Sequence, residues 1–319
     1  MRLRPRLAPV SRKSRPICKS KIHWKPPSRK ILWPALSMAQ HERKPTTLPD
    51  TEAQAKPPFS FFVWPEPAKL EGPLSTDRPG FSDTAFLVPR GHAHIEMGHI
   101  YSYDQEKRSE TQSHLVAGTS LRVGLLDEFE LRVKWSGMSL TESKFPDVSS
   151  AGRHFKNHQH DDGATDMSVG FKTPLLKHTD TNHLPNVSMV PALSLPTGTD
   201  NKTTGDVDPS FELAWNYPLS DKFVLYGVGS IASISDAQGR FAQAAGSLAG
   251  CYTVNSELSF FLEYFGVYPN TRDTDCQHNI NGGPVFLITD NIQLDVGIGM
   301  GLNEEAPDFF INWGLSIRF

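Results

Sequence analysis

Hydrophobic and polar residues alternate along the C-terminal segment 309–319. Apolar side chains occupy one face and mostly polar or small side chains the other: Phe309, Ile311, Trp313, Leu315, Ile317 and Phe319 against Asn312, Gly314, Ser316 and Arg318. Because successive side chains of a strand point to opposite faces, this period of two predicts a β-strand. Aromatic residues at both ends of the apolar face are typical of the lipid-facing band of an outer-membrane barrel, although a soluble sandwich strand can show the same alternation.

The alternation recurs upstream and is clearest at 129–136, where four apolar residues alternate with Glu130, Arg132, Lys134 and Ser136. Turn signals divide the chain into twelve predicted strands: 92–103, 112–125, 129–136, 167–172, 187–195, 211–217, 223–233, 240–252, 258–264, 278–288, 292–300 and 309–319. A closed barrel with both ends on one side of the membrane needs an even number of strands. The connections predicted between strands are mostly tight turns at one end of the barrel and long loops at the other end. A soluble sandwich gives no reason for loop lengths to be sorted in this way. The pattern therefore predicts an all-β fold, a transmembrane antiparallel β-barrel of about twelve strands.

Two segments depart from this regular pattern. The polar stretch Ser139 to Thr165 shows no apolar face and is predicted to be a flexible loop. Pro191 lies within a predicted strand, and because proline lacks an N–H group, we expect irregular or poor pairing there.

The composition fits a barrel better than a helical membrane protein. Mean hydropathy is -0.38, and no run of about 18 apolar residues is present. In a barrel every second residue faces the interior and can be polar, so this polarity does not exclude a membrane location.

The N-terminal part differs in charge from the rest. Residues 1–44 hold 13 of the 32 Lys and Arg but one of the 35 acids, which leaves 19 bases and 34 acids beyond them. We therefore divide the chain into a disordered, basic, Pro-rich leader and linker at 1–75 and a barrel at 76–319. An apolar run followed by a small-x-small pattern at 31–40 is a candidate export signal; a disordered basic tail or a transit peptide are the alternatives. The basic run lacks a folded scaffold with interleaved aromatics, so we expect no nucleic-acid binding.

Several short motifs, in this order, resemble a known family. They are Thr76-Asp77-Arg78-Pro79-Gly80-Phe81, Val88-Pro89-Arg90-Gly91-His92, the hairpin 124–132, Leu193-Ser194-Leu195-Pro196-Thr197-Gly198 and Asp290-Asn291-Ile292-Gln293-Leu294-Asp295. The segment from about residue 72 to the C-terminus is similar to the outer-membrane family labelled "Putative MetA-pathway of phenol degradation". The resemblance implies a channel in the outer membrane of a Gram-negative cell, in some cases linked to uptake of aromatic or other hydrophobic compounds.

Charged and polar residues on the inward face of the predicted strands are the candidate functional residues. We expect these side chains to line the lumen: Glu96, Arg122, Glu130, Arg132, Lys134, Lys172, Glu212, Glu263, Gln293, Asp295 and Arg318. Opposite charges on neighbouring strands, such as Arg122 and Glu130, should pair and fill part of the interior. The pattern leaves open whether the barrel is an open pore or a plugged one.

Other residue clusters are weaker candidates. His154, His158, His160, Asp161 and Asp162 are compatible with metal binding, but we expect a solvated loop and no metal or cofactor. His92, His94 and His99 are predicted to be interfacial side chains. No G-x-S-x-G nucleophile motif is present, and we do not expect an enzyme.

The sequence thus predicts an outer-membrane channel for passive uptake of small solutes, with hydrophobic or aromatic compounds among the candidates. The alternatives are a non-conducting structural or surface-binding barrel and a lipid-hydrolysing barrel. Expected partners are outer-membrane lipid, a small solute and the barrel assembly machinery, which would recognise the C-terminal strand through Phe319.

Overall fold

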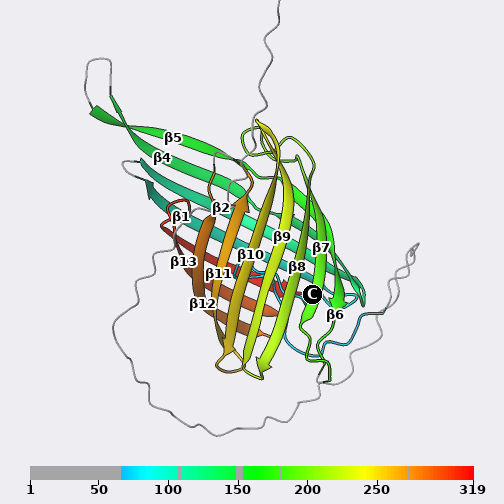
Figure 1. The fold of residues 1–319 in the computed structure, drawn as a ribbon. Helices are drawn as coiled ribbons and strands as arrows, with labels where there is room; N and C mark the ends of the chain where they lie inside the picture. Colours follow the sequence, from blue (N-terminus) through cyan, green and yellow to red (C-terminus); the bar gives the residue numbers. More distant parts are fainter. Residues whose placement is uncertain (1–65, 107–108, 149–153, 180, 272–273) are drawn as a thin grey trace, which may run out of the picture. The chain divides into compact units, whose positions relative to one another are not determined.

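Antiparallel strands make up most of the computed structural model, which describes residues 66–319 except 107–108, 149–153, 180 and 272–273 (Figure 1). The candidate export signal at 31–40 lies outside the described residues. The described part contains fourteen strands and no helix: β1 Ala93–Glu106, β2 Ser109–Leu126, β3 Phe129–Trp135, β4 Met138–Val148, β5 His154–Ala164, β6 Met167–Leu176, β7 Asn186–Leu195, β8 Asp208–Ser220, β9 Phe223–Asp236, β10 Gly239–Thr253, β11 Leu258–Pro269, β12 Gln277–Thr289, β13 Ile292–Gly301 and β14 Phe309–Arg318. Accordingly, no helix in this part is long and apolar enough to span a membrane.

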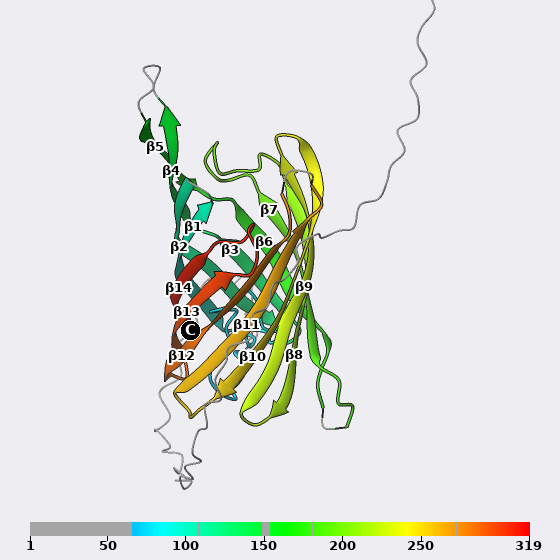
Figure 2. The same ribbon diagram turned by 60° about the vertical axis from the view of Figure 1, so that its left-hand side comes forward.

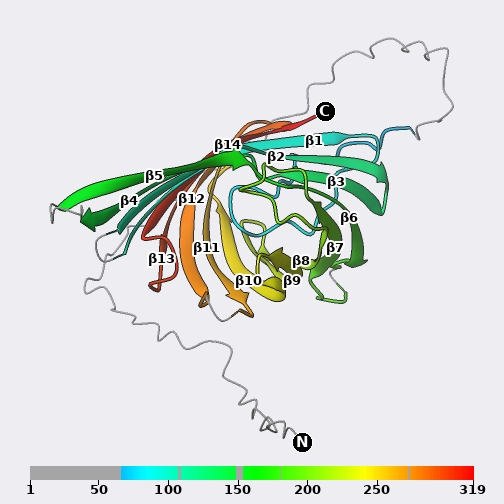
Figure 3. The ribbon, with the colours of Figure 1, turned by 90° about the horizontal axis from the view of Figure 1, so that it is seen from above.

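The sheet closes on itself. Strand β1 pairs with β2 on one side and with β14 on the other, where His94 lies opposite Arg318. The strand order β1-β14-β13-β12-β11-β10-β9-β8-β7-β6-β3-β2 returns to β1 and forms a ring of twelve antiparallel strands (Figure 3). The predicted all-β, twelve-stranded antiparallel barrel is confirmed.

The β4–β5 hairpin lies outside this ring and projects beyond it (Figure 2). Strand β2 pairs with β3 along Thr119–Leu126 and with β4 along Glu110–Val116. The change of partner strand occurs at Gly137, which has a φ of 103°. A Cβ atom there would collide with the Val116 carbonyl, so glycine is required at this junction.

The prediction of a flexible loop from Ser139 to Thr165 was wrong, because most of this stretch forms β4 and β5. Strands β1, β2, β9 and β10 likewise extend beyond the strand ends predicted from the sequence, into segments that we expected to be loops. These extensions carry polar residues on both faces, so they give no period-two hydrophobic signal. Strand pairing holds them, together with polar side-chain contacts such as that between Lys202 and Asp161.

The ring has an apolar outer face and a polar inner face. Adjacent residues show the alternation: Leu121 is 37% exposed and Arg122 is 0% exposed, and Leu262 is 61% exposed whereas Glu263 is 1% exposed. Such alternation matches a wall with lipid on one side and a packed polar interior on the other.

Pairing between β6 and β7 is interrupted near Pro191. Gly170 pairs with Ala192, and Thr173 pairs with Met189 in the same register. The two residues of β6 that lie between Gly170 and Thr173 form no pair with β7. The predicted irregularity at Pro191 is confirmed, and its cause is the missing N–H group.

Candidate functional site

A segment without regular secondary structure lies inside the ring of strands (Figure 3). We call residues 68–91 the strap. Its two ends meet at the end of the barrel where Phe319 lies: the Ala68 amide donates to the Arg90 carbonyl at 2.8 Å, and His92 Nε2 lies 3.0 Å from the Ala68 carbonyl oxygen. The strap is therefore a loop that enters and leaves the lumen at the same end.

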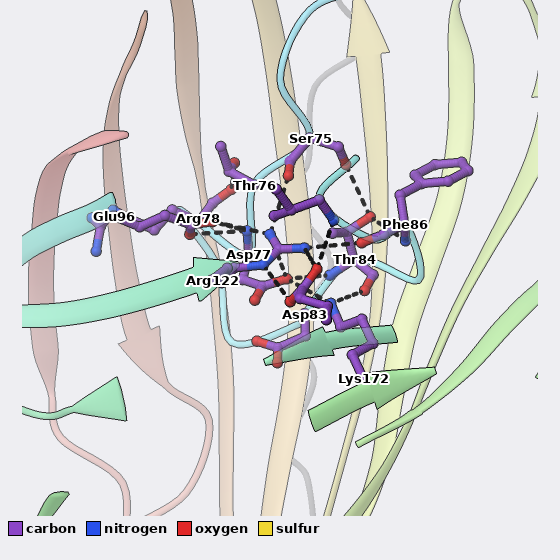
Figure 4. Close-up of polar contacts among 12 residues, drawn as sticks. Ser75, Thr76, Asp77, Arg78, Asp83, Thr84, Phe86, Glu96, Arg122 and Lys172 are labelled. Atoms are coloured by element: carbon purple, nitrogen blue, oxygen red, sulfur yellow. Dashed lines mark hydrogen bonds and ion pairs between the residues drawn. The ribbon is translucent and has the colours of Figure 1, made fainter. Parts of the chain in front are cut away.

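Asp77 is the centre of the strap's ion pairs (Figure 4). Its carboxylate lies 3.3 Å from Arg122 Nη1 and 3.2 Å from Lys172 Nζ, and it also pairs with Arg132. Its backbone amide donates to Glu96 Oε2 at 3.0 Å. Burial alone would raise the pKa of the Asp77 carboxyl, but the surrounding cations outweigh burial and hold this pKa well below its usual range.

Asp83 provides a second carboxylate on the strap. It pairs with Arg132 Nη2 at 2.7 Å and with Lys134 Nζ at 2.8 Å. Burial raises the pKa of the Asp83 carboxyl and the neighbouring Asp77 raises it further, but the cations dominate and lower it to about 2. Both strap carboxylates are thus charged at neutral pH and anchored to the barrel wall.

Arg122 joins the strap to three strands at once. Its guanidinium binds Glu130 at 2.8 and 3.0 Å and Glu96 at 3.0 Å, and donates to the carbonyl oxygens of Phe86 at 2.9 Å and Ser75 at 3.1 Å. The predicted pairing of Arg122 with Glu130 is confirmed. A fully buried guanidinium needs this many acceptors, because an unpaired buried charge is strongly unfavourable.

Arg78 extends the strap toward β13. It forms a bidentate pair with Asp295, with distances of 2.8 and 3.2 Å. Gly98 on β1 and Gly314 on β14 leave the space for its side chain, since a Cβ atom at either position would collide with the guanidinium.

The tip of the strap is held through its backbone. Glu263 accepts hydrogen bonds from the amides of Phe81 at 2.7 Å and Ser82 at 2.8 Å, and from Ser82 Oγ at 2.5 Å. The Phe81 ring stacks on Phe265 with centroids 4.8 Å apart. Further along, Asn216 Oδ1 accepts from the Ala85 amide at 2.5 Å.

Ten of the eleven candidate residues from the sequence contact the strap directly. Besides those described above, Glu130 accepts from the Val88 amide at 2.7 Å, Lys172 donates to the Thr84 carbonyl at 2.7 Å, Gln293 donates to Thr76 Oγ1 at 2.9 Å, and Arg318 donates to the Gly72 carbonyl at 2.8 Å. The eleventh, Glu212, lines a cavity together with Asp83. The structure therefore gathers these residues around one segment.

Sequence reasoning missed the strap as their partner. Asp77, Arg78 and Asp83 stand close together in an otherwise weakly charged stretch, and that spacing was the available signal. The interfacial location predicted for His94 was wrong: this residue faces the interior and is 1% exposed. Its position on β1, two residues before Glu96, puts both on the inner face.

The histidine cluster lies on β5 and not on a loop. His158 Nδ1 is 3.2 Å from Glu142 Oε1 on β4; the side chain of His154 lies outside the described residues. Among the described residues, no group of three or more His, Cys, Asp or Glu side chains is arranged to hold a metal ion.

A closed antiparallel ring with an apolar outer face and a polar interior is the architecture of an outer-membrane β-barrel. An outer membrane channel from Pseudomonas putida F1 is similar in fold, with a TM-score of 0.52 and 16% identity over 76% of this chain and 99% of that chain. The NanC porin has a TM-score of 0.42 and 9% identity over 70% of this chain and 98% of that chain. No curated protein matches the chain in sequence.

The family model described as "Putative MetA-pathway of phenol degradation" matches residues 76–319. The chain belongs to this family, as the resemblance implied. It is an outer-membrane barrel whose fold is similar to that of an outer membrane channel.

Proposed function

We propose that the protein is a channel for passive uptake of small solutes whose lumen is narrowed by the strap. The observation that carries this proposal is the buried set of contacts between the strap and ten inward-facing residues of the barrel wall. These contacts are polar, so water and ions can replace them when the strap moves. Solute then follows its own gradient through the wider lumen.

The family description supports hydrophobic or aromatic compounds as candidate solutes.

We further propose that residues 1–75 are a leader with an export signal for a Gram-negative envelope, and that the barrel follows at 76–319. We also propose that the assembly machinery recognises the last strand through Phe319, whose side chain is exposed.

A reversible cross-link tests the role of the strap. Ser82 Oγ on the strap and Ser247 Oγ on β10 lie 2.6 Å apart, close to the length of a disulfide bond, so cysteines at both positions should cross-link. The native cysteines Cys18, Cys251 and Cys276 are replaced by serine in every variant of this experiment, the control included, so that the introduced cysteines are the only thiols. The full chain with Ser82→Cys and Ser247→Cys in this background is reconstituted in planar bilayers, and single-channel current is recorded before and after reduction.

We expect small current steps with the strap locked, and larger steps after reduction. The matched control, Ser247→Cys in the same background, should respond to neither oxidant nor reductant. Equal currents in both redox states would show that the strap does not constrict the lumen. An absence of current in both states would favour the alternative of a non-conducting structural or surface-binding barrel.

A further inference from the structure

A partly open cavity of about 110 Å³ lies beside the strap and is lined by residues of β3, β6, β7 and β8. Asp83 contributes from the strap. Arg132, Lys134 and Glu212 contribute from the wall, together with the hydroxyl groups of Ser168 and Ser210. A water molecule needs roughly 10–15 Å³ by this kind of measure, so the cavity has room for several waters or for one small organic molecule. Its place beside the strap puts it on the route that a solute would take through the lumen.

Three buried polar atoms of the residues that line this cavity have no hydrogen-bond partner among the described residues. They are Nε and Nη1 of Arg132, whose side chain is 2% exposed, and Oε1 of Glu212. Arg132 Nε lies 3.6 Å from Glu130 Oε1, which leaves Nη1 as the donor for a ligand. The other terminal nitrogen of Arg132 is already bound to Asp77 and Asp83. Because buried polar groups are rarely left unpaired, the cavity offers one free donor and one free acceptor to a ligand.

The charges around the cavity are mixed. Arg132 and Lys134 both pair with Asp83, so neither an anion nor a cation finds an unpaired opposite charge among these three side chains. A neutral group that both donates and accepts hydrogen bonds fits the two free atoms, and a hydroxyl is the smallest such group.

Part of the cavity wall is apolar. Val190 and Ala192 on β7 line it together with Gly170 on β6, at the interruption in strand pairing caused by Pro191. This wall suits a hydrocarbon skeleton and supplies no further hydrogen bond through its side chains.

We propose that this cavity is the solute-binding site of the channel and takes a small neutral molecule with a hydroxyl group on an apolar skeleton. The hydroxyl accepts from Arg132 Nη1 and donates to Glu212 Oε1, while the skeleton lies against Val190 and Ala192. This assignment builds on the channel function proposed above, but binding can be measured without current.

The test uses cyclohexanol and, as a matched probe that cannot donate, cyclohexyl methyl ether. Their dissociation constants are determined by saturation-transfer NMR on the full chain in lipid nanodiscs, with empty nanodiscs subtracted. We expect cyclohexanol to bind about tenfold more tightly than the ether, because the ether leaves the buried Glu212 oxygen without a donor. Glu212→Leu should abolish this preference, and Glu212→Gln, which keeps an acceptor oxygen, should retain most of it.

A second variant fills the cavity. Ala192→Phe should weaken binding of cyclohexanol, whereas Leu193→Phe, on the exposed face of the same strand, should not. Folding of each variant is checked by the mobility difference between boiled and unboiled samples. Equal binding of the two probes by the wild type, or an unchanged preference in folded Glu212→Leu, would overturn the assignment. Selective binding in a barrel without current would uphold the site and reject the channel instead.

Discussion

The two sides of the lumen hold the strap in different ways. On the side formed by β2, β3 and β6, Arg122, Arg132 and Lys172 bind the carboxylate of Asp77. On the side formed by β8 and β11, uncharged Asn216 and anionic Glu263 accept hydrogen bonds, mostly from the backbone of the strap. The first side binds a carboxylate of the strap as well as its main chain, whereas the second binds chiefly the main chain.

This difference assigns different tasks to the two sides. Buried ion pairs lose a large amount of free energy when one partner is removed, because the other charge remains buried. Hydrogen bonds to backbone amides depend little on the side chains of the strap. The cationic side therefore makes strap binding sensitive to charge and pH, and the Glu263 side positions the tip.

Removing charge without removing the acceptor oxygen compares the two sides directly. Asp77→Asn leaves three buried cations without their shared anion, and we expect a loss of about 3 kcal/mol or more in the free energy of unfolding. Glu263→Gln keeps an oxygen for the amides of Phe81 and Ser82, and we expect a loss of about 1 kcal/mol. Urea unfolding of the refolded barrel measures both.

The control for this pair is Asp127→Asn, because Asp127 forms an exposed ion pair with Arg90. Such pairs contribute about 1 kcal/mol at most, and the effect should be near zero. Similar losses for Asp77→Asn and Glu263→Gln would remove the distinction between the two sides.

Acid should weaken the cationic side selectively. The pKa of Asp83 in the bound strap is about 2, against an ordinary value of 3.8, and that of Asp77 is also lowered. A carboxyl whose pKa is lowered in the folded state stabilises that state fully above about pH 4, and this stabilisation is lost as the pH falls toward 2. For Asp83 the shift corresponds to about 2 kcal/mol.

The thermal midpoint of the folded barrel between pH 6 and pH 2 tests this expectation. Between about pH 4 and pH 2 the wild type should lose thermal stability as the pH falls. In the double variant Asp77→Asn with Asp83→Asn, the decline should be clearly smaller. An identical decline in both proteins would show that other carboxyl groups cause the acid sensitivity.

The ring strands could be predicted from the sequence because lipid and the polar interior impose opposite requirements on neighbouring residues. The segment 129–136 shows this requirement plainly, and it forms β3 with Glu130 and Arg132 buried. The β4–β5 hairpin could not be found in this way. Polar residues stand on both of its faces, so its side chains show no sustained alternating pattern.

The inward-facing charges could also be named from the sequence, together with the pairing of neighbours such as Arg122 and Glu130. Their main partner could not, because the strap has no periodicity and its contacts are remote in sequence. Arg78 and Asp295, for example, are 217 positions apart. Strand register fixes which residues face inward, but it does not show which distant segment fills the space between them.

The smallest expected effect concerns the space for Arg78. In Gly314→Ala the new methyl group would meet the Arg78 guanidinium, which must shift away from Asp295. We expect a loss of about 1 kcal/mol in the free energy of unfolding. The matched control is Gly229→Ala on β9, where a Cβ atom meets nothing within 4 Å and alanine should be neutral or slightly stabilising.

A double-mutant cycle identifies the cause of that loss. With Arg78→Ala in the background, the methyl group at position 314 has no guanidinium to displace, so the cost of Gly314→Ala should largely disappear. If Gly314→Ala still lowers the free energy of unfolding in this background, the strain lies in β14 itself. Glycine at this position would then be needed for the barrel wall and not for the strap. A cost that disappears would show that a glycine in the wall is needed to seat the strap in the lumen.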